Sequence, residues 1–352
     1  MFSREVHWFF AGCRTGNGAF QDWKWSVPGL SKMLLRVART IPFSRMRFTN
    51  MEVQARGLLI LKITHEEQAG KSEQWKEEIF RKLYGSPPCV IRQMWDDLID
   101  TDILECKLDF GERNHTGLRM LLISHYFLWT YPRNSRMIEA HFSPIIEKET
   151  RGVGLWHWIE KIYWLMPSRI HWLDRFNDPD SEPFIATVDG TDCKVWEPRK
   201  THPDFQFDPG MFSHKFERAA WKYEVAVAIF SDNIVWVNGP WRGGKGDKEI
   251  LIDGNEEAME LGNVDSILGM MLEGKFIICD RGYRTSQANL LQKLAYRRDD
   301  DPPEIAQFKA RVLCRHESVN ARIKQFRILS DTFRNTKRKH ELAFKAVCLI
   351  VQ

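Results

Sequence analysis

The segment Phe184–Trp196 reads FIATVDGTDCKVW and carries a strong strand signal. An apolar, partly β-branched run reaches Asp189 and Gly190, and an extended pattern resumes at Val195. Apolar runs bounded by Asp or Gly are typical of buried strands. An acid at the end of such a strand lies at a sheet edge, where it can hold a metal ion. Asp-Gly is also a common hairpin signal, so this segment alone leaves a turn at Asp189 open.

The same arrangement recurs downstream. The run Lys275–Asp280, KFIICD, again brings an aspartate to the end of an apolar segment. Between the two runs the pattern predicts a hairpin of strands over 223–230 and 234–238, followed by a glycine-rich loop over 239–247. That loop contains neither a P-loop nor a dinucleotide-binding fingerprint. Helices are predicted loosely over 248–272 and then over 286–297, 305–326 and 341–351, the last of which should cover the sheet.

The first half of the chain has a helical pattern. Helices are predicted over 51–69 and 73–84, and a third should begin with Ser86 as N-cap and Pro87 as its first residue. Residues 116–166 form a compact helical unit compatible with a helix-turn-helix, with Lys148 and Arg151 as candidate DNA contacts. Any three-helix bundle has a similar pattern, so the alternative of a purely structural bundle stays open.

Charge and cysteine usage limit the function classes. The net charge is only +4, but basic residues gather at 1–60 and 308–345, which suits either a polyanionic partner or a solvated basic face. The seven cysteines include no C-x-x-C pair, which argues against a disulfide framework and a structural zinc site. We find no secretory signal and no apolar run of about 18 residues, so we expect a reduced, intracellular protein without a membrane span.

Three acids stand out as a candidate metal site. Asp189 and Asp280 end their strands, and Glu317 lies on the basic helix predicted over 305–326. Mg²⁺ and Mn²⁺ prefer oxygen ligands, and two such ions can cut a phosphodiester between them. Arg281, Arg315 and Lys324 are candidates to offset the repulsion among the acids and to hold the DNA backbone. Taken singly, the two aspartates could instead form turns, and Glu317 could be one more charge on a solvated helix.

Several short motifs in order resemble a known family. From about 184 to 350 the chain looks like the catalytic domain of DDE transposases of the PIF/Harbinger type and related bacterial insertion-sequence enzymes. The matching motifs are Val188-Asp189-Gly190-Thr191, Ser213-His214-Lys215-Phe216, Tyr223-Glu224, Val235-Trp236-Val237-Asn238-Gly239-Pro240, Asp280-Arg281-Gly282-Tyr283, and Glu317 ahead of Arg322-Ile323-Lys324-Gln325-Phe326-Arg327-Ile328-Leu329.

The resemblance implies an α/β architecture with an RNase H-like catalytic domain, a mixed sheet flanked by helices, after an all-α region. The domains would be an irregular basic segment over 1–50, a helical region over 51–170 and the catalytic domain over 171–352. Asp189, Asp280 and Glu317 would be the catalytic residues, holding two Mg²⁺ or Mn²⁺ ions. The implied reaction is DNA cleavage followed by attack of the 3′-OH on target DNA. Arg322 joins the candidate DNA contacts.

Two acids depart from the family pattern or add to it. Asp192 stands where the family usually has His, and Asp247 falls where it often carries an acid, so both are possible accessory residues. Side chains three apart on a regular strand point to opposite faces, which favours Asp189 alone as the ligand.

The expected partners are double-stranded DNA, as transposon ends and target, and a second copy of the chain; a separate DNA-binding protein is a further candidate partner. The expected location is the nucleus in a eukaryotic host and otherwise the cytoplasm or nucleoid. The alternatives are a host-recruited descendant that binds DNA or protein without transposing and, more distantly, an RNA-directed nuclease of the same fold.

Overall fold

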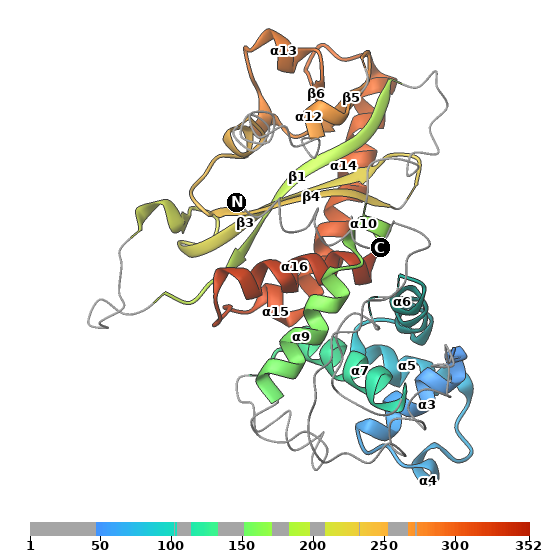
Figure 1. Ribbon diagram of the computed structural model, residues 1–352. Coiled ribbons are helices and arrows are strands. Elements are labelled where there is room, and N and C mark those ends of the chain that lie inside the picture. The colour runs from blue at the N-terminus through green and yellow to red at the C-terminus, as the bar shows by residue number, and fades with distance from the viewer. Residues whose placement is uncertain are drawn as a thin grey trace, which may run out of the picture. The chain divides into compact units, whose positions relative to one another are not determined.

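The computed structural model describes residues 47–101, 103, 114–132, 151–170, 183–197, 208–231, 233–252, 267–271 and 273–352. These residues belong to one compact unit, Arg47–Gln352 (Figure 1). Residues 1–46 of the basic segment predicted over 1–50, and the turn of the predicted helix-turn-helix with Lys148, lie outside the described residues. None of the helices in the described part of the chain has both the length and the apolar character that crossing a bilayer requires.

A mixed sheet forms the centre of the second half. Its strands are β1 (Phe184–Lys194), β2 (Phe212–Ser213), β3 (Arg218–Ala228), β4 (Ile234–Arg242), β5 (Phe276–Cys279) and β6 (Leu294–Tyr296). The order is β4-β3-β1-β5-β6, with the short β2 also pairing with β3. The pairs β1–β3 and β3–β4 are antiparallel, whereas β1–β5 and β5–β6 are parallel. The expected mixed sheet flanked by helices is therefore present.

Three C-terminal helices pack on this sheet (Figure 1). They are α14 (Pro303–Gln325), α15 (Arg327–Ser330) and α16 (Lys337–Val351). On α16 the Phe344 ring stacks on Tyr223 of β3 at 3.7 Å between ring centroids, and His340 Nδ1 is hydrogen-bonded to the Tyr223 hydroxyl at 2.7 Å. On α14 His316 Nδ1 is hydrogen-bonded to the Thr187 hydroxyl of β1 at 2.7 Å. The prediction that the last helix covers the sheet is confirmed.

The first half is helical, as expected. Its elements are α3 (Asn50–Ile60), α4 (His65–Gln68), α5 (Glu73–Tyr84), α6 (Pro88–Asp100), α7 (Asn114–Thr130), α9 (Arg151–Tyr163) and α10 (Met166–Arg169). The helix predicted over 51–69 is two helices, because Thr49 with Glu52 and Thr64 with Glu67 form two separate capping boxes. Ser86 is not the N-cap of α6, since its hydroxyl is hydrogen-bonded to buried His125 and Pro87 takes the cap position.

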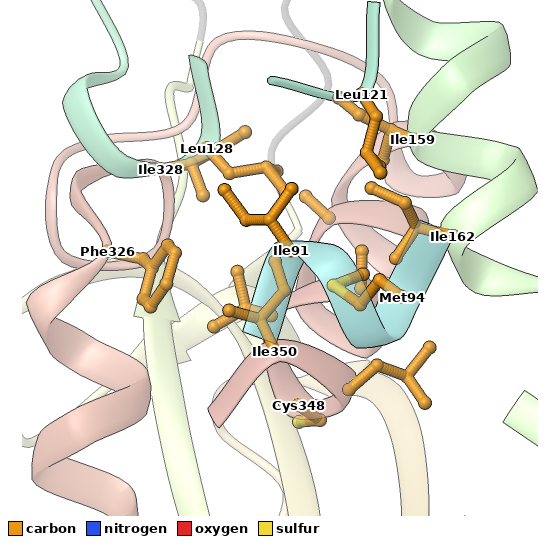
Figure 2. Packing of buried hydrophobic residues seen from close by; sticks show 14 of the residues in the cluster. Ile91, Met94, Leu121, Leu128, Ile159, Ile162, Phe326, Ile328, Cys348 and Ile350 are labelled. Atoms are coloured by element: carbon orange, nitrogen blue, oxygen red, sulfur yellow. The ribbon is translucent and has the colours of Figure 1, made fainter. Parts of the chain in front are cut away.

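One hydrophobic core joins the helical region to the C-terminal helices. Figure 2 shows α6, α7 and α9 contributing side chains such as Met94, Leu121 and Ile159 to the cluster that also contains Phe326 and Ile350. The same cluster continues to buried residues of β3, including Tyr223 and Val225. Burying these apolar side chains supplies the main driving force for folding of this unit.

Three local predictions need correction. Asp189 and Gly190 lie within β1, which is continuous from Phe184 to Lys194, so the hairpin and the strand end predicted at Asp189 are both wrong. The helix predicted over 286–297 is a four-residue helix, α13 (Ala288–Leu291), followed by β6, because three residues that pair with β5 are too few to show a strand pattern. The loop predicted over 239–247 is shorter, since β4 runs to Arg242.

Candidate active site

Asp189 and Asp280 lie on neighbouring strands at the same level of the sheet. Val188 of β1 pairs with Cys279 of β5 in parallel register, and each aspartate is the next residue of its chain segment. Asp280 follows the last residue of β5 and caps the short helix η2 (Arg281–Tyr283) by accepting a hydrogen bond from Gly282 N at 2.7 Å. The sheet therefore brings together two acids that are far apart in sequence.

Asp247 is the third acid of this group. Residues 247–252 are helical, and Asp247 is the first of them. A Cβ added to Gly190 would meet Asp247 Oδ1 at 2.6 Å, and one added to Gly282 would meet Asp247 Oδ2 at 3.5 Å. The Asp247 carboxylate thus lies against Gly190, where only a residue without a side chain leaves it this space, and near Gly282.

The electrostatics of Asp189 reflect this crowding. Burial raises the pKa of Asp189 to about 6, and the charges of Asp280 and Asp247 raise it as well. The Gly190 N–H, which donates to Asp189 Oδ1 at 2.8 Å, and the positive charge of Lys215 act in the opposite direction on this pKa. A divalent cation among the three carboxylates would relieve the same repulsion.

Glu317 is exposed on α14, and none of the described contacts joins it to the aspartates. Its neighbour one turn later, Asn320, does reach the site, because Asn320 Nδ2 donates to Asp189 Oδ2 at 3.0 Å. Asn320 Oδ1 is buried and has no hydrogen-bond partner among the described residues. Residues three apart on a helix are neighbours, so Glu317 lies next to Asn320 on α14, although its own side chain is exposed.

Asp192 faces a different environment. It is 7% exposed, accepts a hydrogen bond from the Ser213 hydroxyl at 2.5 Å, and lies 3.9 Å from Lys222 Nζ. Lys222 is also 3.1 Å from Asp247 Oδ1 and donates to the Lys245 carbonyl. Lys222 therefore neutralises both accessory acids, Asp192 and Asp247. The sequence alone did not point to Lys222. It lies beside Asp192 because the two residues are paired in the register of β1 and β3.

Glu224 is a second residue without an expected role. It is fully buried on β3, where its Oε1 accepts a hydrogen bond from the Tyr283 hydroxyl at 3.0 Å. Burial raises the pKa of Glu224 to about 8, although the Tyr283 hydrogen bond lowers it. This contact ties β3 to the segment that follows Asp280. The acid in the motif Tyr223-Glu224 was the signal in the sequence that pointed to Glu224. The contact with Tyr283 could not be predicted, because Tyr283 is distant in sequence.

The candidate DNA contacts divide by their geometry. Arg315 donates to the Ala228 carbonyl, and Lys324 donates to the Asp192 carbonyl and to Cys193 Sγ, so both side chains contact the protein itself. Arg281 is 54% exposed in an ion pair with Asp299, and Arg322 is exposed. Arg151 begins α9. Contact of any of these residues with DNA stays a prediction.

The donor set suits a hard divalent cation, because the groups of Asp189, Asp247 and Asp280 that lie near one another are carboxylates. Within the described residues no three His, Cys, Asp or Glu side chains are close enough to form a ready-made metal site. Asn320, Lys222 and Gly282 N each contact one of the three aspartates.

Comparison with known proteins relates the second half of the chain to one family. No curated protein and no solved structure matches the chain. A family match does exist, and it begins one residue before Asp189 and runs to the end of the chain, so that it includes Asp247, Asp280 and Glu317. Residues 188–352 match the family described as DDE superfamily endonuclease, and this part of the chain is therefore similar to nucleases of the transposase type.

Proposed function

We propose that this protein is a metal-dependent DNA endonuclease and transposase of the PIF/Harbinger type. The observation that carries the proposal is the parallel register of Val188 with Cys279, which places Asp189 beside Asp280 within the segment that matches the endonuclease family. The strand order β4-β3-β1-β5-β6, with two parallel strands beyond β1, supports an RNase H-like fold for this domain.

In this proposal Asp189 and Asp280 hold the divalent ions, Glu317 completes the triad, and Asp247 assists. Two Mg²⁺ or Mn²⁺ ions, when bound, supply an activated water and stabilise the charge on the leaving oxygen. The chain's own part is positional. Asn320 fixes the Asp189 carboxylate and Gly282 N fixes that of Asp280, while the proposed third ligand, Glu317, lies one turn before Asn320 on α14. DNA ends and target DNA are the proposed substrates, with a second copy of the chain as partner.

The test is nicking of an end-labelled duplex by the purified full chain with Mn²⁺. We expect Asp189→Ala and Asp280→Ala to abolish nicking and Glu273→Ala, an exposed acid before β5, to leave it unchanged. Equal cutting by the parent and both aspartate variants would refute the proposal. Glu317→Gln and Asp247→Asn, compared side by side, show which acid is the third ligand.

Strand transfer is tested separately with a pre-cut DNA end that carries a free 3′-OH and a supercoiled plasmid. Joined product with the parent, and none with Asp189→Ala, is the expected result. A parent that nicks without joining would limit the function to endonuclease activity. A parent that binds DNA and does neither would favour the recruited, DNA-binding alternative.

A further inference from the structure

A cavity of about 800 Å³ is lined in part by residues that follow Asp247 and Asp280 closely in sequence. Lys248, which follows Asp247 directly, lines one part of it, and Arg284, the C-cap residue of the helix that Asp280 caps, lines another. The function proposed above gives this cavity no role. Its volume is that of a pocket for a small ligand rather than for a double helix.

The lining combines two kinds of surface. Tyr296 and the exposed Leu291 supply aromatic and apolar area, and the Arg284 guanidinium lies over the Tyr296 ring at 5.6 Å from its centroid. Lys248 and Arg284 supply positive charge, and Thr285 and Ser286 supply hydroxyls. Nucleic-acid bases stack on aromatic rings and on guanidinium planes, while phosphates take Lys, Arg and hydroxyl contacts.

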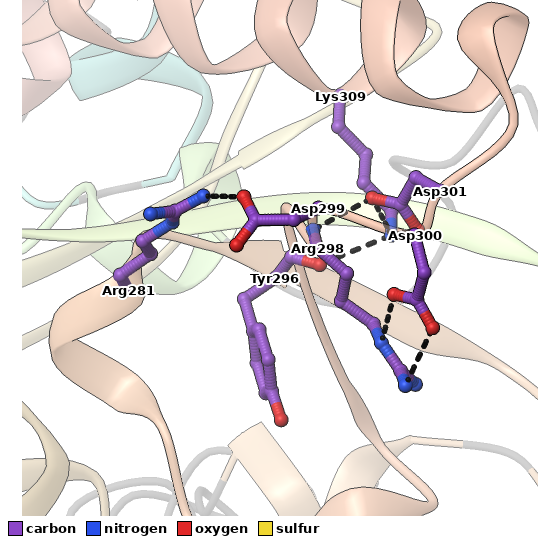
Figure 3. Close-up of polar contacts among 7 residues, drawn as sticks. All are labelled: Arg281, Tyr296, Arg298, Asp299, Asp300, Asp301 and Lys309. Atoms are coloured by element: carbon purple, nitrogen blue, oxygen red, sulfur yellow. Dashed lines mark hydrogen bonds and ion pairs between the residues drawn. The ribbon is translucent and has the colours of Figure 1, made fainter.

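The backbone beneath this surface is held firmly. Lys309 of α14 donates to the Tyr296 carbonyl at 3.0 Å and to Asp301 at 2.9 Å, and its side chain is 6% exposed. Figure 3 shows the Tyr296 ring pointing away from Lys309 and Asp301. The anchor fixes the backbone position of Tyr296. Its half-buried ring packs in part against the hydrophobic cluster that contains Ile277 and Leu294 and lines the cavity with its remaining surface.

Two exposed ion pairs border the same cavity (Figure 3). Asp299 contacts Arg281 at 2.5 Å and Asp300 contacts Arg298 at 3.0 Å, and all four side chains are more than half exposed. Exposed pairs contribute little to stability, so the two arginines can turn from these carboxylates toward a phosphate, while Asp299 and Asp300 keep their negative charge in the lining.

We infer that this cavity binds one unpaired nucleotide of the DNA strand, with its base stacked on Tyr296 and Arg284 and its phosphate near Lys248. A base within a duplex offers no free face to Tyr296, whereas an unpaired base does. The inference rests on the proposed function for the nature of the polymer, and it adds that the site takes a strand with at least one unpaired base.

The experiment measures binding of the full chain without divalent ions, so that no cleavage occurs. The probe is a fluorescein-labelled single strand of about 12 nucleotides, within the range that single-strand binding sites cover. The same strand in a blunt duplex is the comparison. A second form of the strand carries one 2-aminopurine, whose fluorescence is quenched when it stacks.

Tyr296→Ala should weaken single-strand binding about 5- to 150-fold, the ratio equivalent to the loss of one stacked base, and should remove the quenching. Tyr296→Phe keeps the ring and should behave as the parent, and duplex binding should be the same for all three proteins. Lys248→Ala should lower the salt slope of single-strand binding by about 0.7, the value for one phosphate contact. Lys82→Ala, an exposed lysine of α5 paired with Glu78, should leave that slope unchanged.

Parental single-strand binding by Tyr296→Ala, or an equal loss on the duplex, overturns the inference. If Tyr296→Ala does not fold, Arg284→Ala, which changes an exposed residue, provides the same comparison. The outcome is separable from the nuclease test. A chain that shows Tyr296-dependent binding but never nicks DNA refutes only the proposed function, and one that nicks DNA with no role for Tyr296 and Arg284 refutes only this inference.

Discussion

Asn320 of α14 donates a hydrogen bond from Nδ2 to Oδ2 of Asp189 on β1, at 3.0 Å. The other Asp189 oxygen accepts from Gly190 N at 2.8 Å, so each oxygen of this carboxylate has one donor. The orientation of Asp189 toward Asp280 and Asp247 is therefore set jointly by the strand and by the helix. Partners that orient a metal-binding group typically change metal affinity or activity when they are lost.

Asn320→Ala should reduce nicking about 10- to 100-fold and raise the Mn²⁺ concentration needed for half-maximal binding, because Asp189 loses its helix-side donor. Metal binding is measured by isothermal titration without DNA. Ser318→Ala is the matched control, since Ser318 is exposed on the same helix and bonds only to the Cys314 carbonyl in the described contacts. Parental metal binding and nicking by Asn320→Ala would contradict a positioning role.

Gly190→Ala should displace the Asp247 carboxylate, because the new methyl group would lie 2.6 Å from Asp247 Oδ1. Replacing a strand glycine by alanine stabilises the folded state by about 0.5–1 kcal/mol, which offsets part of the cost of moving Asp247. The free energy of unfolding should therefore change little, while nicking falls to the level of Asp247→Asn. Urea unfolding measures the stability of the variant, and the nicking assay measures its activity. Gly154→Ala is the control, since its nearest atom is at 3.7 Å. Nicking by Gly190→Ala at the parental rate would show that Asp247 has no part in the reaction.

Lys222→Gln should destabilise the folded state by about 1–3 kcal/mol, because it leaves Asp247 and Asp192 without their shared cation in a largely buried place. Adding Asp247→Asn should recover part of this loss, and the double-mutant cycle measures the coupling. The surface pair Lys76–Glu73, at 2.6 Å, is the comparison and should lose no more than about 1 kcal/mol in Lys76→Gln. Purely additive effects of Lys222→Gln and Asp247→Asn would show that the pair is not coupled.

Stability should fall as the pH drops from about 6.5 toward 3. Burial lowers the pKa of His125 and of His340 to about 3, so both rings stay neutral in the folded state. The unfolded chain protonates them below about 6.5, which favours unfolding, and at pH 5 each costs about 2 kcal/mol. Above pH 6.5 this contribution to stability is fully present.

Urea unfolding of the parent and of His340→Gln at pH 7.5, 6 and 5 measures this dependence. The variant is less stable at pH 7.5, because it loses the contact with Tyr223, but its stability should decline less steeply with acid. His214→Gln, which changes an exposed ring, should keep the parental dependence. A decline in His340→Gln as steep as that of the parent would remove His340 as a cause.

Local sequence was sufficient for the elements and for part of the site. The apolar runs that end at Asp189 and Asp280 are adjacent parallel strands, as such runs in an α/β chain should be, and the helix 73–84 has the bounds that its apolar face indicates. Periodicity is a property of a few neighbouring residues, so it is visible without the rest of the fold. A strand of three residues, such as β6, is too short to show a period, and only its pairing with β5 defines it.

Only the tertiary structure decided which polar groups meet. Asp247, Lys222 and Asn320 reach Asp189 or its neighbours from three different elements, and Asn320 is 131 residues away in sequence. The rotation of α14 about its axis, fixed where His316 contacts Thr187, brings Asn320 to Asp189 and leaves Glu317 exposed. Such contacts depend on how the faces of distant elements pack, which no local pattern contains. The sequence by itself determined two apolar runs that each carry an aspartate, whereas the pairing of β1 with β5 made Asp189 and Asp280 neighbours and packing determined the groups that hold them.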